Sequence, residues 1–451
     1  MVRTADLLEA LIAECRAMSS SSLPPAAVES AKHSILDWVG VTLRGAREPA
    51  PKILAAEASA MGSARAATLI GSCDRTSVLW ATLVNGTAGH ALDYDDTNLL
   101  MPGHPTAPIL PALLAQAEAS HISGRAVIDA LVAGVEFESR LGQALAPEHY
   151  EAGWHATATL GTFGAAAASA HLMDLAAPQW TAALGIAASQ SSGLQAMFGT
   201  MCKPYQVGKA AMEGLESARL ASRGFSGPSD LRELLRGYEM TYNANARTAP
   251  VVAGPSAEHP RLAIEQTLFK YHAACYFTHS SIEAMVHLKS TNGLQPEVID
   301  SIGVLVSPTA LSICRYPRPE TGLQCKFSLP AMVAMAALGR DTASADAYTD
   351  SLVADPQLVS LMGRVSVAAD PQLASACARV VVSLKGGSTL EATRDAGAPA
   401  HSLETQKRRV QAKFESLASP LVGNAGALAT VKMIDRLEEQ SSIELLPILA
   451  G

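Results

Sequence analysis

The strongest constraint on the fold is the spacing of apolar residues in the first half of the chain. In residues 4–17 and 26–44, leucine, isoleucine and valine recur at the intervals of an amphipathic helix. Aromatic residues make up only 5% of the chain, and alanine, leucine and valine supply most of its apolar content, a composition that favours closely packed helices. We therefore expect one helix after another up to about residue 245.

The pattern then changes to short valine-rich runs, which are typical of strands: 304–306, 365–368 and 379–384, with a hairpin partner at 389–392. Helical spacing returns after residue 403. At 451 residues the chain also exceeds the size of a single hydrophobic core.

These patterns predict a mainly α fold. A large all-helical domain would be built from both chain ends, residues 1–260 and 399–451. A smaller α+β lid domain, residues 261–398, would be inserted between them.

Charge and cysteine content narrow the class of protein. A net charge of -8 argues against nucleic acid and anionic membranes as partners, because both attract basic surfaces. The seven cysteines are scattered and form no CxxC pair, so we expect reduced thiols and no structural zinc site. Neither a signal-peptide pattern nor a long uncharged apolar run stands out, which predicts a cytoplasmic protein.

One segment, HALDYDDTNLLMPGH at residues 90–104, is far more polar than its surroundings. It holds three carboxylates, Asp93, Asp95 and Asp96, and ends in His104. Buried charges must be paired or must shift their pKa, so burying such a segment costs free energy. A protein that keeps it is expected to use it for a function. We interpret it as part of an active site. The same three carboxylates could alternatively bind Mg²⁺ or another divalent ion.

Two further segments carry groups suited to proton chemistry. His155 stands just before a glycine- and alanine-rich segment, where the N-terminus of a helix would favour an anion. Lys203 precedes Pro204, which disfavours helix at the lysine and predicts a loop.

The inserted region adds Lys270 and His279, in KYHAACYFTH, and Tyr316, in CRYPRPETG. Such a collection of cations and donors suits a small substrate with several carboxylates. The chain lacks a dinucleotide fingerprint, a phosphate-binding loop and a nucleophile elbow, so we expect a reaction without a cofactor.

Each of these residues also has a structural interpretation. Asp95 and Asp96 could cap an element or pair with arginines, and Lys203 could be a surface charge. His279 could be a core residue, and Tyr316 could pack at an interface. For Asp95 and Asp96 we favour the structural interpretation. For the other residues, their concentration in a few glycine- and proline-marked segments favours a functional one.

Several of these segments together resemble the MmgE/PrpD family: HALDYDDT with the following HPTAPILPALLAQAE, GWHATATLGTFGAAAASA, KPYQVGKAAMEGLESARLASRGFSGP, KYHAACYFTHSSIEA and KFSLPAMVAMAAL. Members include 2-methylcitrate dehydratases, cis-aconitate decarboxylases and iminodisuccinate epimerases. The resemblance implies a homodimer with a large helical domain, a smaller lid domain and a site that needs no cofactor. It assigns the family's functional positions to Asp93, with Thr97 beside it, His104, His155, Lys203 and Tyr316.

The shared chemistry of these activities is a proton moved at a carbon next to a carboxylate. The resulting hypothesis gives proton transfer to His155 or His104, and the substrate carboxylate to Lys203. Asp93 would orient a histidine and Tyr316 would donate a proton. Thr97, Lys270 and His279 would help to bind the substrate.

We expect a lyase, either a dehydratase or a decarboxylase, acting on a di- or tricarboxylate. An epimerase of an iminodisuccinate-type substrate is the alternative within the family. A protein that binds a carboxylate without turnover is the alternative from another class, and a metal-dependent hydrolase is a third.

Overall fold

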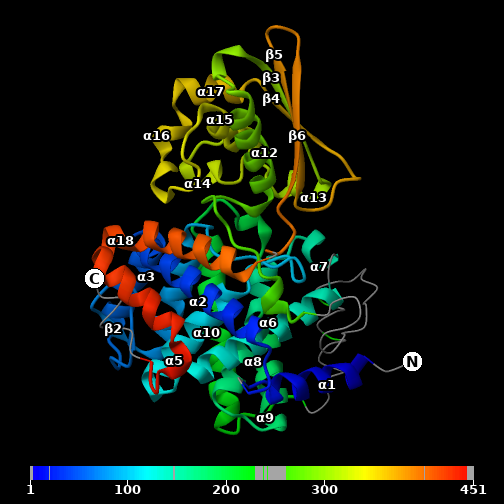
Figure 1. Cartoon of the computed structure of the whole chain (residues 1–451). Helices are drawn as coiled ribbons and strands as arrows, with labels where there is room; N and C mark the ends of the chain where they lie inside the picture. The colour runs from blue at the N-terminus through cyan, green and yellow to red at the C-terminus, as the bar shows by residue number, and fades with distance from the viewer. Residues whose placement is uncertain are drawn as a thin grey trace. The chain divides into compact units, whose positions relative to one another are not determined.

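The computed structural model describes residues 4–19, 21–145, 148–228, 261–400 and 402–443, together with 237 and 241. The chain divides into two compact units. The first, the helical unit, comprises Met1–Ala91, Asp95–Phe269 and Pro399–Gly451; the second, the mixed unit, comprises Leu92–Tyr94 and Lys270–Ala398. The predicted mainly α fold, with a helical part built from both chain ends and a smaller α+β part, is confirmed (Figure 1).

The described helices of the helical unit are α1 (Thr4–Ala17), α2 (Pro25–Gly45), α3 (Pro49–Met61), α4 (Val78–Ala91), α5 (Thr106–Ser120), α6 (Gly124–Leu145), α7 (Glu148–Glu151), α8 (Ala156–Leu172), α9 (Ala177–Gln190), α10 (Cys202–Ser222) and α18 (Leu403–Asp435). A two-stranded antiparallel ribbon, β1 (Ala67–Thr68) and β2 (Arg75–Thr76), joins α3 to α4.

Helices α4, α5, α8 and α10 pack together at the centre of the helical unit. Small residues let their backbones approach closely. A Cβ atom added to Gly208 of α10 would lie 2.3 Å from the carbonyl oxygen of Leu83 in α4, and one added to Gly86 of α4 would lie 2.9 Å from Cα of Gly208. The alanine- and glycine-rich composition is therefore what allows α4 and α10 to touch.

Helix α18 packs against α2, so the C-terminal part of the chain completes a unit that the N-terminal part begins. A buried ion pair joins the two helices, with Nζ of Lys413 2.7 Å from Oδ1 of Asp37. By length and composition alone, α18 could cross a membrane, but a helix packed in a protein core passes the same test.

The mixed unit contains a four-stranded sheet in the order β4-β3-β5-β6. Strand β3 (Ile299–Val306) pairs in parallel with β4 (Val365–Ala369) and antiparallel with β5 (Cys377–Leu384), which in turn pairs antiparallel with β6 (Thr389–Asp395). Alternate residues of β5 are buried, as expected for a sheet with one covered face. The valine-rich runs of the sequence thus form the predicted strands.

Helices α12 (Tyr276–Asn292) and α15 (Leu329–Leu338) contact strands of this sheet (Figure 1). The shorter helices of the mixed unit are α13 (Pro308–Ile313), α14 (Gly322–Cys325), α16 (Asp350–Val353) and α17 (Pro356–Met362).

The mixed unit resumes at Lys270, later than the boundary at 261 drawn from the sequence. The residues just before Lys270 form hydrogen bonds with segments of the helical unit. The backbone N–H of Ala263 donates to Oε2 of Glu136 in α6 at 2.6 Å, and Thr97 and Leu268 exchange two backbone hydrogen bonds of 2.8 Å.

Candidate active site

Five polar side chains from four segments of the helical unit meet in one buried cluster. His90 lies in the last turn of α4, Asp95 and His104 lie in the loop that follows, His155 is the N-cap residue of α8, and Lys203 lies in the first turn of α10. The close packing of α4, α8 and α10 brings these helix ends together.

Asp95 is the carboxylate at the centre of this cluster. Its Oδ2 lies 2.8 Å from Nδ1 of His90 and 3.1 Å from Nδ1 of His104. Burial by itself would raise the pKa of Asp95, but the two histidines outweigh it and hold that pKa well below its usual range. Asp95 is therefore an ionised group that orients both rings.

His90 links Asp95 to Lys203. Its Nε2 lies 2.6 Å from Nζ of Lys203. Burial lowers the pKa of His90 to about 4, even though the Asp95 carboxylate opposes that shift. A neutral ring that donates from Nδ1 to Asp95 has its lone pair on Nε2, where it accepts from the lysine. Asp95 thus holds the His90 ring, and the ring in turn fixes the position of the Lys203 amino group.

His155 is a buried histidine of the cluster. Burial, reinforced by Lys203 and His90, holds the pKa of His155 well below its ordinary value. Within the described residues, no group hydrogen-bonds to its Nε2. Its ring lies 5.8 Å from that of His90 and packs edge-on against Phe198 at 5.0 Å, between centroids. The ring is therefore neutral and keeps a lone pair for a proton.

His104 is the most accessible member of the cluster. Its side chain is 12% exposed, whereas those of His90 and Asp95 are fully buried. Its ring centroid lies 4.6 Å from that of His90, and its backbone N–H donates to Oγ1 of Thr157 in α8 at 3.2 Å. Of the five side chains, that of His104 is therefore the most open to solvent.

The sequence-based prediction for the backbone at Lys203 was wrong. Lys203 lies inside α10, although Pro204 follows it. Proline is tolerated in the first turn of a helix, because the N–H groups there have no intrahelical acceptor. The position of His155 immediately before a helix is as predicted.

Asp96, next to Asp95, has a different environment. It accepts hydrogen bonds from the backbone N–H and Oγ1 of Thr106 at 3.3 and 2.5 Å. Burial raises the pKa of Asp96 to about 8, although the hydroxyl of Thr106 opposes the shift. Asp96 therefore supports the start of α5, the structural role that the sequence suggested for it.

Thr97 anchors the loop between Asp96 and His104. Its Oγ1 donates to the carbonyl oxygen of Gly103 at 2.9 Å, and Asn98 and Gly103 exchange backbone hydrogen bonds of 2.8 and 3.2 Å. These contacts make Thr97 a support of the loop that carries His104.

Asp93 and Lys270 form a buried ion pair within the mixed unit. Nζ of Lys270 lies 2.9 Å from Oδ1 of Asp93 and 2.8 Å from its carbonyl oxygen. The backbone of Asp93 has a φ of 51°, in the left-handed region that aspartate tolerates better than most residues. Asp95, rather than Asp93, holds Nδ1 of the two histidines of the helical unit.

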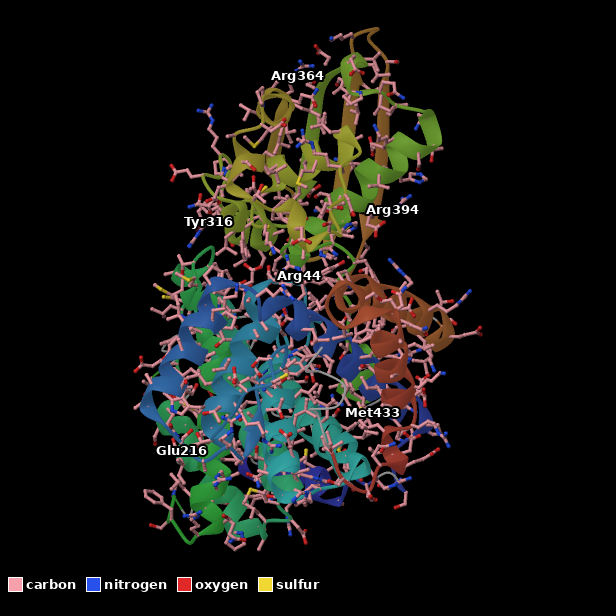
Figure 2. The ribbon with its side chains drawn as sticks, turned by 90° about the vertical axis from the view of Figure 1, so that its left-hand side faces the viewer. Arg44, Glu216, Tyr316, Arg364, Arg394 and Met433 are labelled. Carbon is pink, nitrogen blue, oxygen red and sulfur yellow. The ribbon has the colours of Figure 1, made fainter. Side chains whose placement is uncertain are left out.

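The other two predicted site residues also lie in the mixed unit. His279, in α12, is buried, and its Nε2 lies 3.4 Å from the carbonyl oxygen of Ala274. Burial lowers the pKa of His279 well below its ordinary value. The ring of Tyr316 (Figure 2) is half-buried, and the guanidinium carbon of Arg315 lies 5.5 Å from its centroid.

A divalent metal was the alternative for the acidic segment. His90, Asp95 and His104 offer ligand atoms within 4.8 Å of one another. However, Nδ1 of both rings already faces the same Asp95 oxygen, and Nε2 of His90 faces the Lys203 amine. A lysine amine at that distance competes with a cation for the ring nitrogen. The donors therefore suit an internal hydrogen-bonded chain better than a metal.

Sequence reasoning missed two members of the cluster. His90 was seen only as the first residue of the polar segment, and Asp95 was assigned to structural support. The signal that could have found them is their spacing: a histidine at the end of a helix, followed five residues later by an aspartate in a loop.

Comparisons with known proteins give the family of this chain. Residues 10–248 match the MmgE/PrpD N-terminal domain, and residues 272–439 match the MmgE/PrpD C-terminal domain. The chain is 26% identical to human cis-aconitate decarboxylase over 438 residues, which cover 94% of this chain and 90% of the human protein. It is 30% identical to cis-aconitate decarboxylase from Aspergillus terreus over 297 residues, which cover 63% of this chain and 59% of that protein. With both of its halves matched, the chain belongs to the MmgE/PrpD family.

Proposed function

We propose that this protein is a lyase that acts on a small di- or tricarboxylate, at a carbon next to a carboxylate, and that cis-aconitate is the first substrate to test. The observation that carries this proposal is the chain Asp95–His90–Lys203, with the neutral His155 ring beside it. The names of the relatives described above support the choice of cis-aconitate.

The reaction would be a decarboxylation with proton uptake. One bond between carbon and a carboxylate breaks, and CO₂ leaves. The electron pair left behind spreads over the remaining unsaturated carboxylate, and one proton is added at carbon. A trianion and a proton thus give a dianion and CO₂, so atoms and charge balance.

The cluster has groups for both parts of this reaction. Negative charge builds up on a carboxylate as the electron pair moves, and a fixed ammonium group stabilises such charge. Lys203, which His90 holds in place, would supply this ammonium group. A proton must then be carried to carbon by a group that can gain and lose it, for which His155 and the more accessible His104 are the candidates.

In the mixed unit, we assign to Tyr316 the donation of a proton, and to Lys270 and His279 contacts with substrate carboxylates. Asp93 then acts through Lys270, which it holds by an ion pair. A Tyr316→Phe variant tests the first of these roles, because it removes only the hydroxyl.

The decisive experiment incubates the purified protein in D₂O with cis-aconitate, 2-methylcitrate, citrate or iminodisuccinate and follows each by ¹H NMR. We expect cis-aconitate to lose CO₂ and to give a product with one deuterium on carbon. Deuterium exchange without net conversion would contradict a lyase and favour an epimerase. Absence of both exchange and conversion with every candidate would overturn the carbon-acid reaction.

Two variants make the result specific to the cluster. His155→Ala removes the buried base and should abolish turnover. His287→Ala removes an exposed histidine of α12 and should leave turnover unchanged. A protein that only binds carboxylates would show ligand binding in both variants and turnover in neither.

A further inference from the structure

Gln206 contacts Nδ1 of His155, the ring nitrogen opposite Nε2. It follows Lys203 by three residues, so both side chains leave the same side of α10. Its Oε1 lies 2.8 Å from Nδ1 of His155.

The orientation of this amide follows from its other contact. Nε2 of Gln206 lies 3.5 Å from the carbonyl oxygen of Leu194. A carbonyl oxygen only accepts hydrogen bonds, so the NH₂ end of the amide must face Leu194 and the oxygen must face His155. That oxygen can only accept in turn, which places the ring proton on Nδ1.

The segment 193–195, which includes Leu194, also holds the backbone around His155. The N–H of His155 donates to the carbonyl oxygen of Gly193 at 3.0 Å, and the N–H of Gln195 donates to that of Gly153 at 2.9 Å. Residues 193–195 therefore position the histidine backbone and the glutamine amide together.

We propose that Gln206 is a positioning residue that keeps the proton of the neutral His155 ring on Nδ1, so that Nε2 presents its lone pair. The consequence for catalysis rests on the proposed function, whereas the assignment of the proton does not. The charged and titratable groups around the ring are Lys203 from α10, His90 from α4 and His104 from the loop before α5. Among the residues that the structure describes, the side chain hydrogen-bonded to Nδ1 of His155 is that of Gln206, so Gln206 is the group that selects the tautomer.

The direct test is NMR of protein labelled with ¹⁵N at histidine. Two-bond ¹H–¹⁵N correlations show which ring nitrogen carries the proton, and His155→Gln identifies the His155 signals by their loss. We expect the proton on Nδ1 in the unmodified protein and in Gln206→Glu. In Gln206→Leu, which offers no acceptor, we expect the proton to redistribute toward Nε2.

Kinetics with the proposed substrate supply the second readout. Gln206→Leu should lower kcat about 10- to 100-fold, with KM changed less than about twofold, because it acts on the proton carrier and not on substrate contacts. In Gln206→Glu, a carboxylate beside Nδ1–H favours the charged ring, so the acidic limb of the kcat profile should move to higher pH by about one unit. Gln372→Leu, at an exposed position, is the matched control and should leave kcat unchanged.

The outcomes separate this inference from the proposed function. A proton found on Nε2 in the unmodified protein, or a tautomer unchanged in a folded Gln206→Leu variant, would overturn the role of Gln206. If the tautomer responds as expected but no carboxylate is turned over, the role of Gln206 stands and the proposed function fails. Circular dichroism of each variant checks that it is folded.

Discussion

Nζ of Lys203 and Nε2 of His90 lie 2.6 Å apart, although 113 positions separate the two residues in the chain. A hydrogen bond of this length holds a flexible lysine in one place, and Asp95 holds the histidine in turn. The cluster is thus built on a neutral ring that touches an anion on one side and an amine on the other. Its properties can be tested one contact at a time.

The first prediction concerns the ring of His90. His90→Leu removes the ring nitrogen that lies beside the amino group of Lys203, and it removes one hydrogen-bond donor from Asp95. We expect kcat/KM for cis-aconitate to fall by roughly 100-fold. His287→Leu changes an exposed histidine and should have no effect. A folded His90→Leu variant that retains full activity would show that this ring does not position Lys203.

The second prediction concerns Asp96 and pH. Its folded-state pKa of about 8 lies above the value of about 3.9 in an unfolded chain, so the folded protein binds this proton more tightly. The stabilisation is fully present below about pH 4 and is lost as the pH rises through about 8. We expect the free energy of unfolding, measured by urea titration, to fall from about pH 6 to about pH 9, and to fall less in Asp96→Asn.

Asparagine can mimic the protonated aspartate, since its amide also offers one acceptor and a donor toward Thr106. Asp300→Asn, at an exposed position in β3, is the control and should leave the pH dependence unchanged. If Asp96→Asn instead followed the same pH curve as the parent protein, the buried carboxyl would not be protonated near neutral pH.

Asp93 and Asp95 show what could not be predicted from the sequence. The polar segment, the helix before His155 and the valine-rich strands were all visible from residue type and spacing. What separates Asp95 from Asp93 is the direction in which each side chain leaves a loop, and the local sequence does not encode that direction. The role of His90 likewise depends on α4 packing against α10, a contact between segments distant in the chain.

The backbone of Lys203 was mispredicted for a related reason. The rule that a residue before proline avoids helix is a local one, whereas the position of a helix start depends on the whole segment. The helical and strand periodicities were reliable because they repeat over many residues. Single contacts between segments have no such repetition.

The third prediction concerns the contact between α4 and α10. In Gly208→Ala, the new methyl group would lie 2.3 Å from the carbonyl oxygen of Leu83, so the helices must separate. We expect a loss of about 1–3 kcal/mol in the free energy of unfolding, larger than the helix-propensity gain of alanine. Activity should also fall, because His90 and Lys203 lie on these two helices. Gly386→Ala has open space around the added atom and should change neither quantity.

The fourth prediction compares two lysines of α18. Lys413 pairs with the fully buried Asp37, whereas Lys407 pairs with the partly exposed Asp435, both at 2.7 Å. Lys413→Met leaves a buried carboxylate without this cation and should cost about 3–5 kcal/mol. Lys407→Met should cost less than about 1 kcal/mol, since solvent screens an exposed pair. Equal losses in urea unfolding would contradict the buried pair as a tie between α2 and α18.

The pairing of α2 with α18 also has a consequence for biosynthesis. A ribosome releases α2 long before α18, so the surface of α2 that α18 covers stays open while the segments between them are made. Residues 270–398 of the mixed unit, by contrast, emerge in one continuous run. The helical unit, although it begins before the mixed unit, can therefore finish folding only after α18 has emerged, and a message truncated before α18 would yield an incomplete and aggregation-prone product.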